Sequence, residues 1–192
     1  MEIVKNTIEK FATLSKDSKK SLYSLGKPIS LKKGDYIAEA GSIPENIYIL
    51  KSGVARSYFT DKKGKEYTRN IFTSIRAVGP LGALILNKPS KFSYDCLSDC
   101  ELIVVNFKQF KKLTTNNIEI GNFYAKVLEY VFLELESKVY DLSVLNATER
   151  YLKLKRNNPN IENLIPQYHI ASFLNITPVQ LSRIRKEIYT KK

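Results

Sequence analysis

The side chains best suited to recognition chemistry are polar and cationic, and they gather near the carboxyl end, between Gln167 and Lys186. A helix that starts after Thr177 would have these residues available to an outer face: Val179, Gln180, Ser182, Arg183, Lys186 and Glu187. Guanidinium, ammonium, amide and hydroxyl groups donate hydrogen bonds to phosphates and base edges, so this helix suits a DNA major groove. The same pattern is also typical of a helical hairpin whose basic face is merely solvated.

The neighbouring residues predict the two helices that would position this face. Thr177 is a good N-cap, Pro178 fits the first helical position, and Gln180 completes a capping box. Asn175 lies at the turn, and Asn tolerates left-handed backbone angles better than most residues. Two apolar faces follow the helical period: Ile170, Ala171 and Leu174, then Ile176, Leu181 and Ile184. The stretch Gln167–Lys186 is therefore predicted to be a helix-turn-helix.

Other reactive residues are too few, or wrongly spaced, for a catalytic or metal site. Cys96 and Cys100 cannot supply the four ligands of an iron–sulfur cluster, and their spacing favours a structural role over redox sensing. The single histidine, His169, excludes sites that need several histidine ligands. Gly64 and Lys65 lack the glycine spacing of a phosphate-binding loop. We therefore expect no enzyme activity, no catalytic residue, no cofactor and no metal.

The composition favours an anionic partner. The 192 residues include 43% hydrophobic residues, ample for a core, and carry a formal net charge of +12. Residues 146–192 hold nine Lys or Arg and three acidic residues. About a quarter of the chain thus carries half of the excess positive charge. This concentration favours nucleic acid. No apolar run approaches the roughly 20 residues of a membrane span, and the polar amino-terminal end lacks a signal core, so we expect a cytoplasmic protein.

The hydrophobic period changes along the chain before this region. Residues 1–26 are predicted to form one or two short helices, with a break at Ser15 and an end at Gly26. Within residues 28–112, apolar and polar residues alternate in short runs, and glycine-containing turns separate these runs. This pattern predicts an antiparallel sandwich or barrel. The expected strands are Ile29–Gly34, Ile47–Gly53, Val54–Phe59, Tyr67–Phe72 and Glu101–Asn106.

Residues 115–146 form the longest predicted helix. Its apolar residues recur at spacings close to a heptad: Tyr124, Leu128, Val131, Phe132, Leu135, Val139 and Leu142. Such a seam, flanked by charged residues, is typical of a parallel dimer helix. The alternative is a helix that packs only on its own sheet.

Several motifs resemble the Crp/Fnr superfamily of bacterial regulators, in the order of that family. They are Leu31–Gly41, Ile47–Tyr58, Asp61–Thr68, Asp99–Leu113, Ala147–Lys155 and the helix-turn-helix itself. The resemblance implies an α+β fold of three parts. These are amino-terminal helices with a cyclic-nucleotide-type β-roll (1–114), a dimerisation helix (115–146) and a DNA-binding domain (147–192). Because few residues follow the second helix, we expect the family's β-hairpin wing to be reduced or missing.

The resemblance also places a candidate effector pocket at Gly79, Leu81, Gly82 and Lys91. In the family, a Glu binds the ribose and an Arg binds the cyclic phosphate. Here Pro80 stands in place of the Glu, and residues 87–93 contain no Arg. A lysine supplies a point charge but not the two parallel hydrogen bonds of a guanidinium. We therefore expect no cyclic AMP binding; a different ligand, or a hollow filled by side chains, stays open.

On the DNA side, the resemblance implies that Pro178, Val179 and Arg183 face base edges. Val179 suits a thymine methyl group and Arg183 suits guanine, which favours a site richer in A·T pairs. Gln180 could read adenine, although its capping role competes. Phosphate contacts are expected from Gln167, Thr177, Ser182, Arg185 and Lys186. His169, on the first helix, is expected to face solvent or a phosphate.

Together these features predict a homodimeric transcription regulator that binds double-stranded DNA, with RNA polymerase as a further candidate partner. The alternative is a ligand-binding or protein-interaction module with a vestigial helix-turn-helix. The sequence names neither an effector nor a target site, and it does not distinguish an activator from a repressor.

Overall fold

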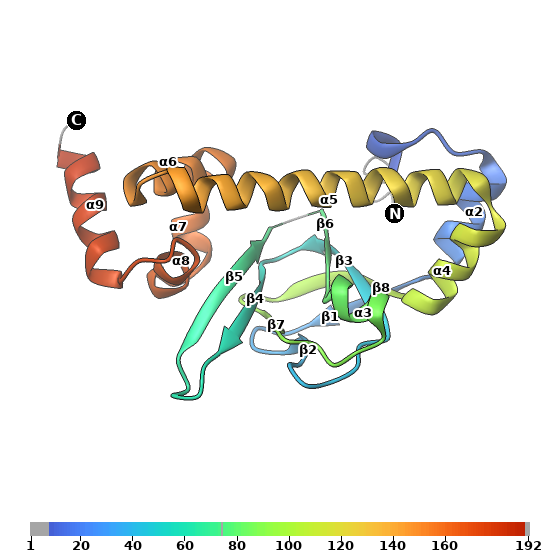
Figure 1. Cartoon of the computed structure of the whole chain (residues 1–192), viewed down its shortest axis with the longest axis horizontal. Coiled ribbons are helices and arrows are strands. Elements are labelled where there is room, and N and C mark those ends of the chain that lie inside the picture. Colours follow the sequence, from blue (N-terminus) through green and yellow to red (C-terminus); the bar gives the residue numbers. More distant parts are fainter. Residues whose placement is uncertain (1–7, 74, 191–192) are drawn as a thin grey trace.

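The computed structural model describes residues 8–73 and 75–190, in which one long helix crosses above two β-sheets (Figure 1). The helices include α2 (Lys16–Ser24), α3 (Leu81–Leu86), α4 (Phe107–Asn116), α5 (Ile118–Val144), α6 (Ala147–Asn157), α7 (Ile161–Leu164), α8 (Gln167–Phe173) and α9 (Pro178–Thr190). The strands are β1 (Gly26–Leu31), β2 (Tyr36–Ala38), β3 (Asn46–Ser52), β4 (Ala55–Thr60), β5 (Glu66–Phe72), β6 (Arg76–Val78), β7 (Ser93–Cys96) and β8 (Cys100–Asn106). Helices α6–α9 gather at one end of α5, and α2 and α4 lie at the other.

The strands form two four-stranded antiparallel sheets, with the orders β1-β8-β3-β6 and β2-β7-β4-β5. In the first sheet, Ile29 lies opposite Leu102 and Ile49 lies opposite Ile103. The predicted α+β class, with antiparallel sheets and carboxyl-terminal helices, is confirmed. Within the described residues no strand follows β8, so no wing hairpin forms as far as Thr190. We call β1–β8 with α3 the sheet domain.

A compact core lies between the two sheets. It consists of Ile37, Leu50, Ala55, Val78, Tyr94, Cys96, Cys100 and Leu102. The two cysteines are free thiols within this core. A hydrogen bond with Cys100, together with burial, raises the pKa of Cys96. Because a protonated thiol is a poor nucleophile, this environment favours the structural role for Cys96.

The amino-terminal helix α2 is tied to the start of α5. Ser15 caps α2, as the predicted break implied, and its hydroxyl donates to Glu119 Oε2 over 2.8 Å. Asn117 caps α5 and donates from its side chain to Ser18 Oγ. The predicted stretch 115–146 therefore contains a break, because residues 115–116 belong to α4. Helix α2 ends at Ser24 with Leu25 as its C-cap, directly before the predicted end at Gly26, where β1 begins. Of the expected amino-terminal helices, residues 1–7 lie outside the described part.

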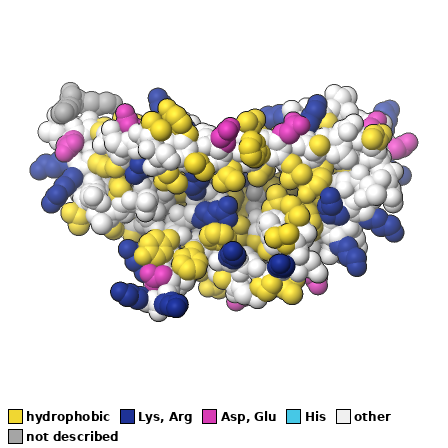
Figure 2. All heavy atoms as spheres, in the orientation of Figure 1, with side chains coloured by type: hydrophobic (Ala, Val, Ile, Leu, Met, Phe, Trp, Pro, Cys, Tyr) yellow, Lys and Arg dark blue, Asp and Glu magenta, His cyan; other side chains and the backbone are white. Residues whose placement is uncertain are grey.

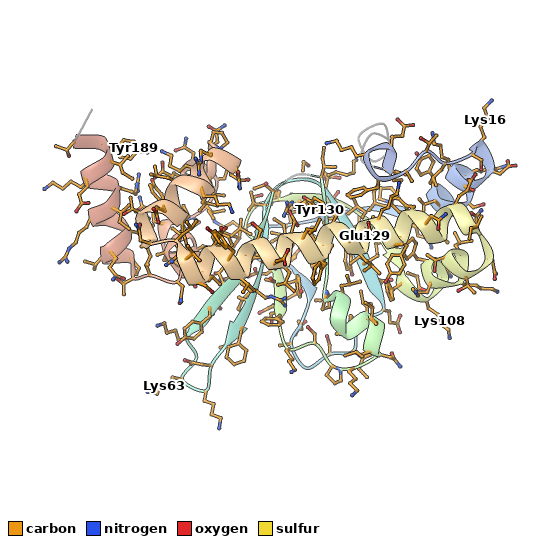
Figure 3. The ribbon with its side chains drawn as sticks, turned by 45° about the horizontal axis from the view of Figure 1, so that its top comes forward. Lys16, Lys63, Lys108, Glu129, Tyr130 and Tyr189 are labelled. Atoms are coloured by element: carbon orange, nitrogen blue, oxygen red, sulfur yellow. The ribbon has the colours of Figure 1, made fainter. Side chains whose placement is uncertain are left out.

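Helix α5 has one side turned to its own sheet domain. Arg76 pairs with Glu134 and donates to the hydroxyl of Tyr130, which is labelled at the middle of α5 in Figure 3. Lys138 donates to Asn70 Oδ1 over 2.8 Å. Large apolar side chains remain exposed elsewhere on the helix, and Figure 2 shows hydrophobic groups along the band where α5 crosses the view. None of the helices within residues 8–73 and 75–190 is both long and apolar enough to cross a bilayer.

The turn at Gly53 offers a test of the sheet packing. Gly53 has φ +95°, and an added β-carbon would stand 2.4 Å from the Asp99 carbonyl oxygen. We expect Gly53→Ala to lower the free energy of unfolding by about 3 kcal/mol, from backbone strain plus overpacking. Gly64→Ala is the control, because its φ is +79° but nothing lies within 4 Å. Gly64→Ala should lower the free energy of unfolding, measured in urea, by about 1 kcal/mol. Equal losses in the two variants would contradict the close approach of Gly53 to Asp99.

Candidate nucleic-acid interface and its contact with the sheet domain

Helices α8 and α9 form the predicted helix-turn-helix. Between them Asn175 adopts φ +57°, the left-handed conformation expected at this turn. The two predicted apolar faces meet in one core with α6 and α7, which contains Tyr151, Leu154, Ile161, Ile165, Ile170, Ala171, Leu174, Leu181 and Ile184. One face of α9 therefore packs in this core, and the opposite face is exposed to solvent.

The capping box at the start of α9 is present. The Thr177 N–H donates to Gln180 Oε1 over 2.8 Å, and the Gln180 N–H donates to Thr177 Oγ1 over 3.2 Å. These bonds satisfy amide groups that the first turn of a helix would otherwise leave unpaired. They also occupy the Gln180 carbonyl, so adenine reading by Gln180 would require the box to open.

The outer face of α9 presents most of the predicted DNA-contacting residues to solvent. The exposed members are Gln167 on α8, Thr177 at the turn, and Pro178, Val179, Gln180, Ser182, Arg183 and Lys186 on α9. Val179 is 61% exposed. Among the described residues, the side chains of Arg183 and Lys186 make no ion pair, so both charges are available to a partner. Figure 2 shows Lys and Arg side chains at this end of the molecule.

Arg185 differs from its neighbours because it points back toward α7. Its Nε lies 2.7 Å from Glu162 Oε1, an ion pair whose angle does not satisfy a hydrogen bond. Glu162 also accepts from the hydroxyls of Tyr151 and Tyr189 and pairs with Lys155. Burial would raise the pKa of Glu162, but these hydrogen bonds and charges lower it overall. Sequence reasoning missed this Glu162 cluster, and it missed α7, which follows the predicted loop.

Helix α8 is packed against the outer face of the second sheet. The Thr68 N–H of β5 donates to Ser172 Oγ over 2.8 Å. Val54 and Leu97 of the sheet domain join the core of α6–α9. The prediction that His169 faces solvent or DNA is wrong, because its side chain is buried in this contact with only 5% exposed.

Arg56 lies at the centre of the contact. Its Nε and Nη2 each lie 2.9 Å from an oxygen of Asp95, and Nη1 lies 2.7 Å from Glu66. Nη1 also lies 3.0 Å from Nδ1 of His169. A guanidinium can only donate, so Nδ1 accepts and the imidazole is neutral. Burial, and secondly the charge of Arg56, lower the pKa of His169 to about 4. Arg56, Glu66, Asp95 and His169 are called the Arg56 cluster below.

The candidate effector residues Gly79, Leu81 and Gly82 lie together where β6 leads into α3, and Lys91 lies in the exposed loop after α3. Pro80 occupies the cap of α3 and makes no side-chain capping bond. The Leu81 amide already donates to the Gly79 carbonyl over 3.0 Å. An effector role for these residues stays a prediction. No group of three or more His, Cys, Asp or Glu in the described part could hold a metal.

A cavity of about 420 Å³ lies elsewhere, between the sheet domain, α5 and the carboxyl-terminal helices. Arg76, Lys138, Arg150 and Lys153 line it together with apolar side chains. None of the four candidate effector residues belongs to it. No local sequence signal could have found it, because its wall comes from five elements.

Comparison with known proteins agrees with this architecture. Residues 28–117 match the model of the cyclic nucleotide-binding domain family. No curated protein sequence matches the chain.

Solved structures of similar fold include FixK2 from Bradyrhizobium japonicum, which is 16% identical with a TM-score of 0.71 over 86% of this chain and 85% of that chain. The c-di-GMP responsive global regulator CLP from Xanthomonas campestris is 14% identical, with a TM-score of 0.69 over 92% and 93%. A protein from Eubacterium rectale assigned to the Crp/Fnr family of transcriptional regulators is 14% identical, with a TM-score of 0.70 over 93% and 85%.

The neutral state of His169 predicts a pH dependence of stability. Because its folded-state pKa is about 4 and its ordinary value is 6.5, the unfolded chain binds more protons between these values. Stability from this group is therefore complete above about pH 6.5 and is lost as the pH falls toward 4. His169→Gln keeps an acceptor for Arg56 but cannot titrate. Its Tm should fall less than that of the parent between about pH 7 and 5.5. Circular dichroism would measure both values of Tm. Equal decreases in the parent and in the variant would contradict a buried neutral imidazole.

Proposed function

We propose that this chain, which has the fold of the Crp/Fnr transcriptional regulators, is a homodimeric regulator that binds double-stranded DNA through α9. One observation carries the proposal: α9 is capped and held on one side, while its other side exposes unpaired cationic and polar groups. The proposed parts are a sensor domain over residues 1–114, a dimerisation helix over 115–146 and a DNA-binding domain over 147–192.

The exposed face of α9 divides into groups for bases and groups for phosphates. Arg183 is charged and unpaired, so it can donate two hydrogen bonds to guanine, and Val179 can contact a thymine methyl. Pro178 lies at the entry of the helix and adds apolar contact. Phosphate contacts fall to Gln167, Thr177, Ser182 and Lys186. Arg185 could join them only by leaving Glu162.

Dimerisation is supported by the two sides of α5. At about 100° per residue, Glu134 and Lys138 share one side of the helix, the side that contacts the sheet domain. Leu135 and Val139 lie about a third of a turn away, and Val139 is 57% exposed. With Phe132 and Leu142 they form an apolar seam, which a second copy of the helix would bury. Two copies would present two α9 helices to a two-fold-related DNA site.

The sensor domain is proposed to lack cyclic AMP binding. Pro80 has neither a carboxylate for a ribose hydroxyl nor an N–H for a phosphate. Lys91 is exposed and offers a single point charge. A regulator of this kind takes its signal from another ligand, or it binds DNA without one.

The assignment of α9 predicts a loss of specificity in Arg183→Ala. We expect the variant to lose about 1–3 kcal/mol of discrimination between the selected site and unrelated DNA. The site would be obtained by selection from random DNA and should be rich in A·T pairs. Affinities for both duplexes would be measured at several salt concentrations, because phosphate contacts weaken with salt.

Lys63→Ala is the matched control, since it removes one positive charge at the tip of the β4–β5 hairpin, far from α9 (Figure 3). Its discrimination should equal that of the parent. If Arg183→Ala also discriminates like the parent, α9 is not the reading helix. A parent chain that binds no duplex at low salt would instead be a ligand-binding or protein-interaction module.

The seam predicts that Val139→Glu weakens the dimer by about 100-fold or more, because each copy would bury an unpaired carboxylate. Sedimentation equilibrium measures the dissociation constant. Ile43→Glu is the control, because Ile43 is equally exposed, at 56%, but lies in the loop between β2 and β3. A monomeric parent, or a Val139→Glu chain that dimerises like the parent, would show that α5 serves only its own sheet domain.

A further inference from the structure

The cavity of about 420 Å³ lies where the sheet domain, α5 and the carboxyl-terminal helices meet. Its wall is formed by the end of β5, β6, α5, α6 and α8. Pockets of about 300–1,000 Å³ bind small organic molecules in many proteins. Apolar side chains supply part of the wall, among them Ile71, Leu142, Leu154, Phe173 and Leu174.

The charged side chains of the cavity are unevenly compensated. Arg76 pairs with Glu134 outside the cavity wall, and Lys153 lies 2.7 Å from Asp141. Lys138 and Arg150 have no carboxylate partner among the described residues. The cavity therefore contains two cationic groups whose charge nothing within the described chain neutralises.

Lys138 is the more unusual of these two groups. Its ammonium donates to Asn70 Oδ1 and to the Arg69 carbonyl, and it lies 5.1 Å from the centre of the Phe173 ring. Burial, and secondly the charge of Arg69, lower the pKa of Lys138 to about 8. A half-buried ammonium without an anion is partly desolvated at a cost, and an incoming negative charge would reduce that cost.

Arg150 has one N–H group that is not used in a hydrogen bond. Its two terminal nitrogens donate to the Leu145 and Leu174 carbonyls, the second over 3.1 Å. Its Nε is buried and has no hydrogen-bond partner. Buried donors are almost always paired in native proteins, so this N–H group is one that an acceptor on a ligand could satisfy.

We propose that this cavity binds a small organic phosphate monoester, whose phosphate lies between Lys138 and Arg150 and whose apolar part contacts Phe173 and Ile71. A phosphate monoester carries about −1.5 to −2 charges at pH 7, which matches two uncompensated cations. Its several acceptor oxygens suit both a point-charge ammonium and a planar guanidinium. The apolar wall selects an ester over inorganic phosphate.

Such a ligand would couple the sheet domain to α8. It would touch β5 and β6 on one side and α6 and α8 on the other, so it would favour the arrangement in which these elements are packed together. An effect on DNA affinity rests on the proposed function, but ligand binding itself does not. The binding test below therefore uses no DNA.

Phenyl phosphate is the probe, titrated into the full chain by calorimetry, with each variant checked by thermal unfolding. Lys138→Gln should weaken binding by about tenfold or more, because a charge-assisted hydrogen bond is lost. Lys63→Gln removes the same charge at the tip of the β4–β5 hairpin and should bind like the parent. Lys138→Arg restores the charge and should recover part of the affinity. In NMR, the pKa of Lys138 should rise from about 8 when the probe binds.

The proposal is overturned if phenyl phosphate does not bind at about millimolar concentration, or if Lys138→Gln binds it as tightly as the parent. An equal loss of binding in Lys63→Gln would also overturn it, because the affinity would then reflect the overall positive charge and not this cavity. Inorganic phosphate should bind more weakly than phenyl phosphate, and equal affinities would overturn the organic class. None of these outcomes depends on whether α9 binds DNA.

Discussion

The buried guanidinium of Arg56 is the interaction on which the arrangement of the carboxyl-terminal helices depends. A buried charge is tolerated only when it is paired and hydrogen-bonded, and removing one partner of such a pair is strongly destabilising. The partners of Arg56 come from three further elements: Glu66 from β5, Asp95 from β7 and His169 from α8. Because α8 supplies one of them, the Arg56 cluster fixes the helix-turn-helix on the sheet and thereby sets the direction in which α9 points.

Helix α5 connects this arrangement to the proposed second copy. One side of α5 is held by polar contacts with the sheet domain, through Arg76 and Lys138, and another side is apolar and exposed. The proposed ligand cavity lies where the polar side of α5 meets the carboxyl-terminal helices. A change at the cavity would therefore reach α8 and the dimer seam through one rigid element, without a separate path of communication.

Structural demands on the helix-turn-helix limit the groups left for recognition. Gln180 contributes its carbonyl to the capping box, and Arg185 is held by Glu162. These contacts stabilise α9, but they engage the carbonyl of Gln180, which stays exposed, and one nitrogen of the half-buried Arg185. The side chains left for the proposed reading of bases are Arg183, which makes no ion pair within the described residues, and the apolar Val179. In the proposed function, the stability of α9 and its choice of bases would thus depend on neighbouring residues of the same helix.

The sequence alone determined the features that arise from neighbouring residues. The Thr177 cap, the left-handed turn at Asn175 and the glycine turns between strands all depend on contacts within a few residues, so their patterns were readable. Only the tertiary structure decided the features made by distant residues. Arg56 and His169 are 113 positions apart, and the Glu162 cluster and the cavity likewise combine separate elements. A lone histidine on a short helix gives no local sign of the sheet that will bury it, because burial depends on how whole elements pack.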